Sequence, residues 1–295
     1  MTTDTAAPEG GLFSDRKEEV QQRLQQGPGP TPPARAAVPS PEPSPNRWTL
    51  ETIRASLDWL TDYTLSGVWR LLQRWDLKLR SARVQQFSPD PDYAQKLGTL
   101  EFCLWEAQRW PRDVVAVFLD EMGFSRWPDP GPDWSERTPV ADRQGSKNGL
   151  WRLVGALNAL TGQVNYLDAY VVGRAKVIQM YEHLADVYPR ARQIYVVQDN
   201  WSIHSHPDVI EALKAWPRIE PVWLPTYAPW LNPIEKLWRW LRQDVLKLHR
   251  LAEDWQKVRG RVRGFLDQFA HGSQRLLEYV GLLGSGRLAR MIHGP

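Results

Sequence analysis

Residues 114–120 read VVAVFLD, six apolar residues that end on an acid. A short apolar run of this kind predicts a buried strand, whose last residue then lies at an edge of the sheet. Residues 193–200, QIYVVQDN, repeat the pattern and bring Asp199 after a second strand. A third acid, Glu235, lies in the first turn of a helix that begins within LNPIEKLW, residues 231–238. The three contexts predict an α/β sheet that gathers three carboxylates at one edge.

Oxygen ligands suit Mg²⁺ and Mn²⁺, which makes Asp120, Asp199 and Glu235 candidate metal ligands. Two such ions roughly 3.5–4 Å apart can clamp the attacking and leaving oxygens of a phosphodiester displacement. Each acid also has an ordinary alternative. Asp120 could cap a turn after a strand, and Asp199 could share a strand-to-helix loop with Asn200. Glu235 could pair with Arg239 one helical turn away or stabilise the helix N-terminus. The metal site is favoured because the three acids occur in matching contexts.

The composition sets limits on the class of protein. A length of 295 residues with 42% hydrophobic residues allows one catalytic domain and a smaller module. A single cysteine, Cys103, excludes a disulfide scaffold and a zinc site built from several cysteines. The chain has no apolar run of about 18 residues, so no membrane span is expected. The N-terminus lacks the pattern of a secretory signal, and the cytoplasm is the expected location.

Positive charge is concentrated in two parts of the chain. Residues 236–295 contain 12 Lys and Arg against 5 Asp and Glu, a net charge of +7, although the whole chain carries only +3. Residues 66–83 contain 5 Lys and Arg against 1 Asp, a net charge of +4. Basic segments on both sides of an acidic catalytic region favour a DNA-binding enzyme. The alternative is that these charges are solvated faces of helices.

Four segments follow from the composition along the chain. Residues 27–46, GPGPTPPARAAVPSPEPSPN, contain too little apolar surface to fold, and a short helix between residues 14 and 26 has too few apolar positions to be stable alone. We expect a disordered N-terminal segment at 1–46, a helix-turn-helix DNA-binding module at 47–88, a catalytic domain with C-terminal helices at 89–285, and a tail at 286–295.

The predicted module consists of two short amphipathic helices joined by a tight turn. Thr49 is a candidate cap for the first helix and Ser66 for the second. Outward Arg and Gln residues on the second helix are typical of a winged-helix-like helix-turn-helix, although a helical hairpin that only packs remains an alternative. The candidate DNA-binding residues are Arg70, Gln73, Arg74, Lys78, Arg80 and Arg83.

The catalytic region is expected to alternate strands and helices in a mixed sheet. Strands are expected near 114–120, 150–158, 164–171, 193–198 and 220–224, and helices near 92–110, 174–187, 207–216 and 233–249. A final helix, with apolar residues spaced by three and four, is expected at 251–269. Its other face carries Lys257, Arg259, Arg261 and Arg263, which could meet DNA phosphates or be solvated.

Three strings in this region resemble the motif blocks of DDE transposases. They are FLDEMGF at 118–124, VVQDNWSIHSH at 196–206 and WLPTYAPWLNPIEKLWRWLR at 223–242. The resemblance is strongest to the bacterial insertion-sequence branch of the mariner superfamily and covers about residues 48–285. It implies a ribonuclease-H-like mixed sheet flanked by helices, which cleaves DNA strands at terminal inverted repeats and transfers them to a target. It also implies double-stranded DNA as partner and a homodimer in the DNA complex.

The same resemblance implies roles for individual residues. It assigns metal ligation to Asp120, Asp199 and Glu235, with two Mg²⁺ ions that Mn²⁺ can replace. Supporting positions beside the acids are Glu121, Asn200, His204 and Asn232. His204 could contact the scissile phosphate, orient a ligand, or make only a structural hydrogen bond. Asn232 is expected to cap the helix that carries Glu235.

Members of the resembling family usually carry two successive helix-turn-helix units, whereas this chain contains only what resembles the second. A frameshifted pair, a truncated copy and a protein with one module are all compatible with that difference. Two other functions also remain open. One is a ribonuclease-H-like nuclease that cleaves without strand transfer, and the other is an inactive or domesticated DNA-binding protein derived from a transposase.

Overall fold

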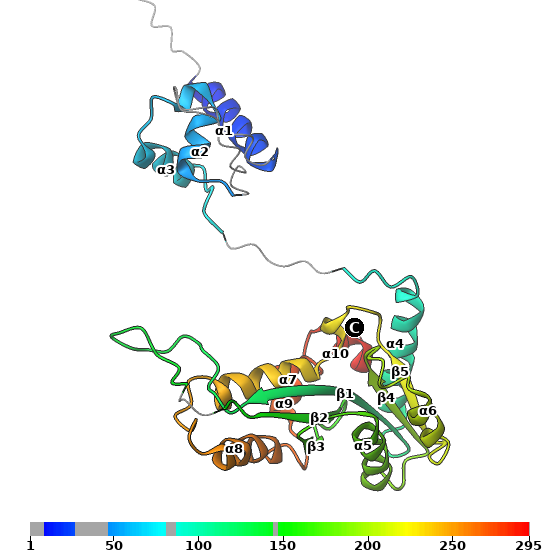
Figure 1. Ribbon diagram of the computed structural model, residues 1–295. Helices are drawn as coiled ribbons and strands as arrows, with labels where there is room; N and C mark the ends of the chain where they lie inside the picture. The colour runs from blue at the N-terminus through cyan, green and yellow to red at the C-terminus, as the bar shows by residue number, and fades with distance from the viewer. Residues whose placement is uncertain (1–8, 27–46, 81–86, 144–146, 295) are drawn as a thin grey trace, which may run out of the picture. The chain divides into compact units, whose positions relative to one another are not determined.

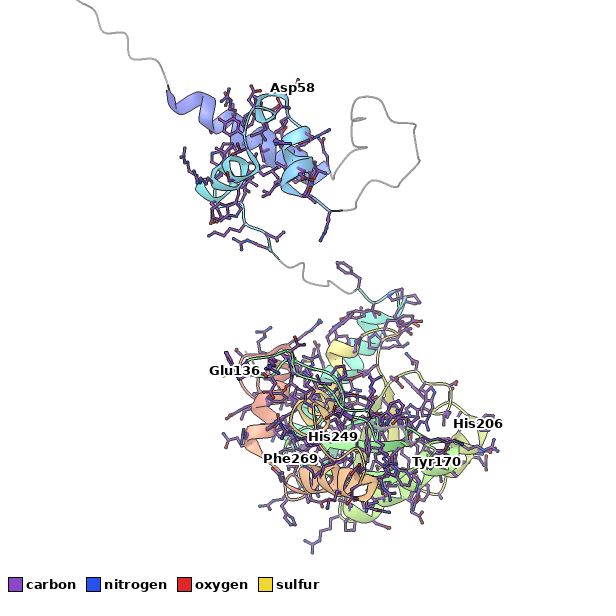
Figure 2. All side chains as sticks on the ribbon, turned by 60° about the vertical axis from the view of Figure 1, so that its left-hand side comes forward. Asp58, Glu136, Tyr170, His206, His249 and Phe269 are labelled. Atoms are coloured by element: carbon purple, nitrogen blue, oxygen red, sulfur yellow. The ribbon has the colours of Figure 1, made fainter. Side chains whose placement is uncertain are left out.

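The computed structural model describes residues 9–26, 47–80, 87–143 and 147–294. The chain divides into two compact units, residues 1–84 and 85–295 (Figure 1). Each unit has its own packed side chains; in Figure 2, Asp58 marks the N-terminal unit and Phe269 the C-terminal unit. Among the helices of these ranges, none is long and apolar enough to span a membrane.

The C-terminal unit is built on one five-stranded mixed sheet with the order β3-β2-β1-β4-β5. β2 pairs antiparallel with β1 and β3, whereas β4 pairs parallel with β1 and β5. The predicted mixed sheet flanked by helices is therefore confirmed. The strands are β1 (Val114–Ser125), β2 (Leu150–Asn158), β3 (Val164–Ala169), β4 (Gln193–Gln198) and β5 (Ile219–Trp223).

Helices cover both faces of the sheet (Figure 1). Successive residues of a strand point to opposite faces, so Phe118 packs into one core and Leu119 into the other. The Leu119 face is covered by α5 (Arg174–Val187) and α6 (Pro207–Leu213). The Phe118 face is covered by α4 (Tyr93–Arg109), α7 (Ile234–Leu241), α8 (Trp255–Asp267), α9 (Gln274–Val280) and α10 (Arg287–His293).

β1 is longer than the apolar run predicts. It continues to Ser125 because its second half pairs with β2 as far as Leu150, although its pairing with β4 ends at Phe118. Asp120 therefore lies inside β1 rather than at its end. It still lies just beyond the parallel part of the sheet, where β4 stops and leaves one side of β1 open.

The predicted helix at 233–249 is shorter and irregular. α7 ends at Leu241 and continues as a π-helical segment, η3 (Arg242–Leu246). Helical geometry ends at Lys247, whose backbone is extended, and Leu248 then adopts a left-handed backbone with a φ of 47°. α8 begins at Trp255, after Asp254 caps it, rather than at residue 251.

The expected tail at 286–295 is wrong for most of its length, because α10 forms there. Leu288, Ala289 and Ile292 of α10 are buried in the core on the α4 side of the sheet. A few apolar residues in a short segment give a weak sequence signal. Packing against α4 provides the stability that the isolated segment lacks.

The N-terminal unit consists of α1 (Glu9–Gln26), α2 (Leu50–Ala55), a short η1 (Asp58–Leu60) and α3 (Leu65–Arg74). The disorder expected at 1–46 is wrong for α1, because Val20 is buried against α2 and α3 and Trp59 donates a hydrogen bond to Glu19. The rest of that segment, residues 1–8 and 27–46, lies outside the described residues.

Candidate active site

Asp120, Asp199 and Glu235 line one cleft of about 420 Å³. They come from β1, from the end of β4 and from the first turn of α7, and are 79 and 36 positions apart in the sequence. The rest of the wall comes from residues after β4 and from the segment between β5 and α7: Asn200, Trp201, Leu224, Pro225, Thr226, Tyr227, Ala228, Pro229 and Asn232.

Asp120 is a largely buried carboxylate with a defined hydrogen-bond donor. Burial, together with the charges of Glu235 and Glu121, raises its pKa to about 8 and so favours the neutral form. The indole Nε1 of Trp238 donates a hydrogen bond to Oδ2 of Asp120 at 2.9 Å. This bond lowers the pKa of Asp120 and so partly offsets the effect of burial. The cleft therefore holds a carboxyl group that ionises readily only beside a positive charge.

Glu235 faces a similar environment. Burial raises its pKa, and so does the charge of Asp199, whereas Arg239 and Arg242 lower it. Two carboxyl groups with raised pKa values in an oxygen-rich cleft fit a hard divalent cation, which supplies the missing positive charge. Within the described ranges, no three His, Cys, Asp or Glu side chains are close enough to hold one ion. The donors are thus present without a preformed three-ligand cage.

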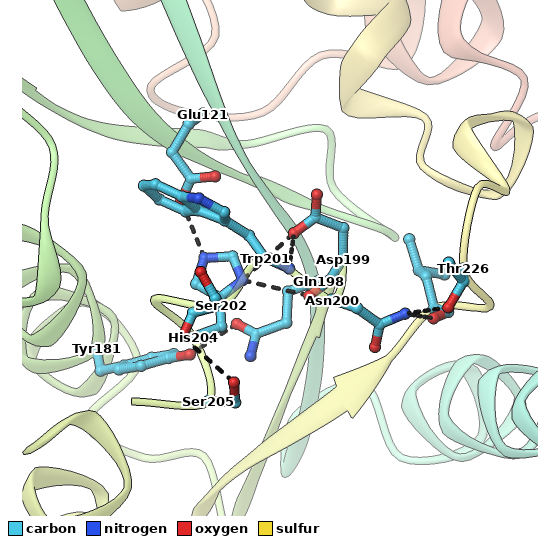
Figure 3. Close-up of polar contacts among 11 residues, drawn as sticks. Glu121, Tyr181, Gln198, Asp199, Asn200, Trp201, Ser202, His204, Ser205 and Thr226 are labelled. Carbon is cyan, nitrogen blue, oxygen red and sulfur yellow. Dashed lines mark hydrogen bonds and ion pairs between the residues drawn. The ribbon is translucent and has the colours of Figure 1, made fainter. Parts of the chain in front are cut away.

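His204 lies between Asp199 of the cleft and Glu121 of β1 (Figure 3). It is only 1% exposed, and its Nε2 lies 3.0 Å from Oε1 of Glu121. Its Nδ1 lies 3.3 Å from the carbonyl oxygen and 3.5 Å from Oδ1 of Asp199. Burial lowers the pKa of His204, but the hydrogen bonds to Asp199 and Glu121 outweigh it and raise the pKa to about 9.

His204 is therefore an imidazolium held between two carboxylates. Its hydrogen bond holds the pKa of Asp199 below the ordinary value, so that Asp199 is ionised in the cleft. Trp201 covers the ring edge-to-face at 5.5 Å between ring centroids. A side chain enclosed in this way does not reach a substrate phosphate, and of the three expected roles the geometry favours orientation of a ligand. Glu121 lies on the opposite face of β1 from Asp120 and binds His204.

Asn200 holds the far wall of the cleft. Its Nδ2 donates to the carbonyl of Leu224 at 2.9 Å and to Oγ1 of Thr226 at 3.2 Å (Figure 3). The same Thr226 donates its backbone N–H to Asp90 at 2.7 Å, and Asp90 also binds Lys96 of α4 at 2.8 Å. The segment after β5 is thus fixed from both sides.

Asn232 does not cap α7 through its side chain, contrary to expectation. Pro233 occupies the cap position with no side-chain hydrogen bond, and only the backbone carbonyl of Asn232 accepts from Glu235, at 3.3 Å. The Asn232 side chain instead lines the cleft. Its Oδ1 is buried and has no hydrogen-bond partner among the described residues.

Sequence reasoning missed two residues that hold the site, Asp90 and Trp238. A signal existed for Trp238, because it lies three residues after Glu235 and therefore near the same face of α7. Nothing comparable exists for Asp90, which lies before α4 and meets Thr226 only in the folded chain.

The candidate DNA-binding residues lie in the N-terminal unit. Arg70 and Arg74 are exposed on α3, Gln73 is half-buried between them, and Lys78 and Arg80 are exposed after α3. Arg83 lies outside the described residues. Thr64, rather than Ser66, caps α3 by accepting a hydrogen bond from the backbone of Gly67. Thr49 caps α2 as expected.

The basic face of α8 is largely engaged within the protein. Arg263 binds Asp168 at 2.6 Å, and Lys257 pairs with Asp254. Arg259 stacks on the Trp151 ring at 4.4 Å. These contacts favour a structural role for most of this face over the DNA contact left open by the sequence.

Known proteins share both the sequence pattern and the fold. Residues 115–259 match the family model of DDE superfamily endonucleases. The chain is 26% identical over 228 residues to the insertion element IS630 uncharacterized 39 kDa protein of Shigella sonnei. That match covers 75% of this chain and 64% of the relative, so the chain spans less than two thirds of that protein.

Two solved structures of the Mos1 transposase are also similar. The strand transfer complex matches with a TM-score of 0.58 at 15% identity, over 99% of this chain and 79% of that one. The paired-end complex with the left transposon end matches with a TM-score of 0.56 at 13% identity, over 99% and 78% of the two chains. At this identity the likeness concerns the fold, and the expected ribonuclease-H-like architecture is confirmed.

Proposed function

We propose that the chain is a transposase of the DDE superfamily of endonucleases, whose family model matches residues 115–259, and that it cuts DNA at the ends of an insertion sequence and joins those ends to a target. The observation that carries the proposal is the convergence of Asp120, Asp199 and Glu235 on one cleft. Three acids that meet where the parallel strand pair β1–β4 ends can hold divalent metal ions, and such ions are suited to phosphodiester chemistry. Double-stranded DNA is accordingly the proposed partner.

The proposed cofactor is a pair of Mg²⁺ ions, which Mn²⁺ can replace, held by Asp120, Asp199 and Glu235. When bound, such ions supply Lewis acids that stabilise charge on the phosphate oxygens. The raised pKa values of Asp120 and Glu235 support this assignment, because a nearby cation favours the ionised form of each carboxyl group.

The protein itself supplies orientation. His204 and Glu121 hold Asp199 ionised and fixed, and Asn200 keeps the wall that contains Thr226 in place. Arg70, Gln73 and Arg74 of α3 are proposed to bind the DNA ends. We further propose that two copies act together, because a cut-and-paste reaction has to bring two ends to one target.

Mg²⁺-dependent nicking and joining of DNA with the flanking ends of the gene tests the proposal. Asp199→Asn is expected to abolish both reactions and leave DNA binding unchanged. Asp208→Asn is the matched control, because Asp208 lies nine positions further along and pairs with Arg174 outside the cleft. Nicking without joining would identify a nuclease instead. Binding without nicking, in a folded protein that binds Mg²⁺, would identify an inactive DNA-binding relative.

A further inference from the structure

Trp238 is a buried residue of α7 that contacts Asp120, one of the cleft acids. It lies in α7, one turn after Glu235, and is only 3% exposed. Its indole N–H points to Oδ2 of Asp120 at 2.9 Å. α7 therefore contributes one predicted metal ligand and also contacts another.

Gly155 makes room for this indole. It lies on β2 directly opposite Asp120 in the β1–β2 register. A Cβ placed on Gly155 would lie 2.6 Å from Cη2 and 2.9 Å from Cζ2 of Trp238. Real side chains do not approach that closely, so only glycine leaves the ring in its present place. The position of the indole is thus fixed by the strand that pairs with Asp120.

We propose that Trp238 is a positioning residue, whose N–H holds one oxygen of Asp120 and leaves the other oxygen to face the metal. A carboxylate on a short side chain can rotate about its terminal torsion, and a donor on one oxygen restricts that rotation. Partners of metal ligands act in this way in many metalloproteins, where their removal weakens metal affinity. The inference deepens the proposed function and rests on it.

The chain contains a matched control in the same helix. Trp240 also donates its indole N–H to an aspartate, Asp244, at 2.7 Å. Asp244 is exposed and does not line the cleft. Replacement of either tryptophan by phenylalanine removes one N–H···carboxylate bond from α7, but only Trp238→Phe removes it from a predicted metal ligand.

The test is a titration of the full-length protein with Mn²⁺, in which the electron paramagnetic resonance signal of the free ion measures how much Mn²⁺ is bound. Trp238→Phe is expected to weaken Mn²⁺ binding about 10-fold, while Trp240→Phe binds as the unmodified protein does. Nicking by Trp238→Phe is expected to need about 10-fold more metal for half its maximal rate and to recover in excess metal. A purely structural defect would not recover in that way.

Equal Mn²⁺ affinity for Trp238→Phe and the unmodified protein would overturn the inference, provided that Asp120→Asn weakens binding. If Asp120→Asn also binds Mn²⁺ normally, the metal site itself is wrong, and the proposed function fails together with the inference. If Trp238→Phe does not fold, Trp238 is instead replaced by its benzothiophene analogue, which keeps the ring volume and lacks the N–H. That replacement is expected to give the same loss of affinity, and unchanged affinity would overturn the inference.

Discussion

At the scale of single residues, the site depends on buried polar groups that hold one another in place. His204 lies between Asp199 and Glu121, and Asp90 lies between Thr226 and Lys96. A buried polar group whose partner is removed loses its hydrogen bond and keeps the cost of its burial. Substitutions at these positions should therefore have large effects although none of these side chains is expected to touch DNA.

We predict that His204→Asn lowers the nicking rate about 10- to 100-fold, because Asp199 loses the group that orients it. The measurement is single-turnover nicking at saturating metal. His206→Asn is the control, since His206 caps α6 at the surface and Asn is also a good cap (Figure 2). A normal rate for His204→Asn would show that Asp199 does not need this contact.

Asp90 should make stability depend on pH. Its hydrogen bonds to Lys96 and to the backbone of Thr226 hold the pKa of Asp90 well below the ordinary value of 3.8. A depressed pKa in the folded state stabilises the protein above pH 3.8, and the contribution is lost as the pH falls below that value. Asp90→Asn is therefore expected to melt a few degrees lower at pH 7, and the difference should shrink in acid. A constant difference from pH 7 to pH 3 would contradict this account.

At the scale of elements, the sequence predicts those whose signal is local. The ranges 150–158, 174–187 and 193–198 agree with β2, α5 and β4, because each is an apolar run or stripe between clear breakers. The extension of β1 beyond Asp120 could not be predicted, because it depends on pairing with β2. α10 was not predicted, and the short helix expected at 14–26 was not predicted to be stable, for a similar reason: each is stabilised by packing on other helices.

The same holds for the site. The apolar runs before Asp120 and Asp199 and the helix start before Glu235 could be recognised in the sequence. The sequence also marked His204 and placed Trp238 near the face of α7 that carries Glu235, but it could not give their partners Glu121 and Asp120, which are distant in sequence. The contact of Asp90 with Thr226 had no sequence signal. Hydrogen bonds of that kind have no periodicity to detect.

Deletion of residues 286–295 should destabilise the C-terminal unit. Leu288 and Ile292 are buried against α4, and burial of each such side chain contributes about 1.5–3 kcal/mol. The melting temperature of the C-terminal unit is expected to fall by roughly 10 °C. Deletion of residues 294–295 alone is the control. An unchanged melting temperature in the longer deletion would show that α10 is not part of the core.

At the scale of the whole molecule, the two units divide the work in the proposed function. The N-terminal unit carries exposed arginines on α3, and the C-terminal unit contains the acidic cleft. DNA recognition and strand chemistry should therefore be separable by substitution.

Arg70→Ala combined with Arg74→Ala is expected to weaken binding to the DNA ends and to reduce the slope of log affinity against log salt by about 2, because each phosphate contact contributes roughly 0.9. Fluorescence anisotropy at several salt concentrations measures the slope. Arg109→Ala with Arg190→Ala removes the same charge from exposed positions of the other unit as a control. Equal slopes for the two double variants would reject α3 as the DNA-binding helix.

Asp120 and Glu121 are consecutive acids that face opposite sides of β1. Because side chains alternate along a strand, one residue inserted between positions 114 and 119 would exchange the two faces. The Glu side chain would then lie nearer the cleft and the Asp side chain nearer His204. Such a copy would keep all three acids, and its loss of function would be invisible to a search that only looks for them. Among inherited copies of this sequence, a working gene therefore needs the unchanged length of this strand as well as its carboxylates.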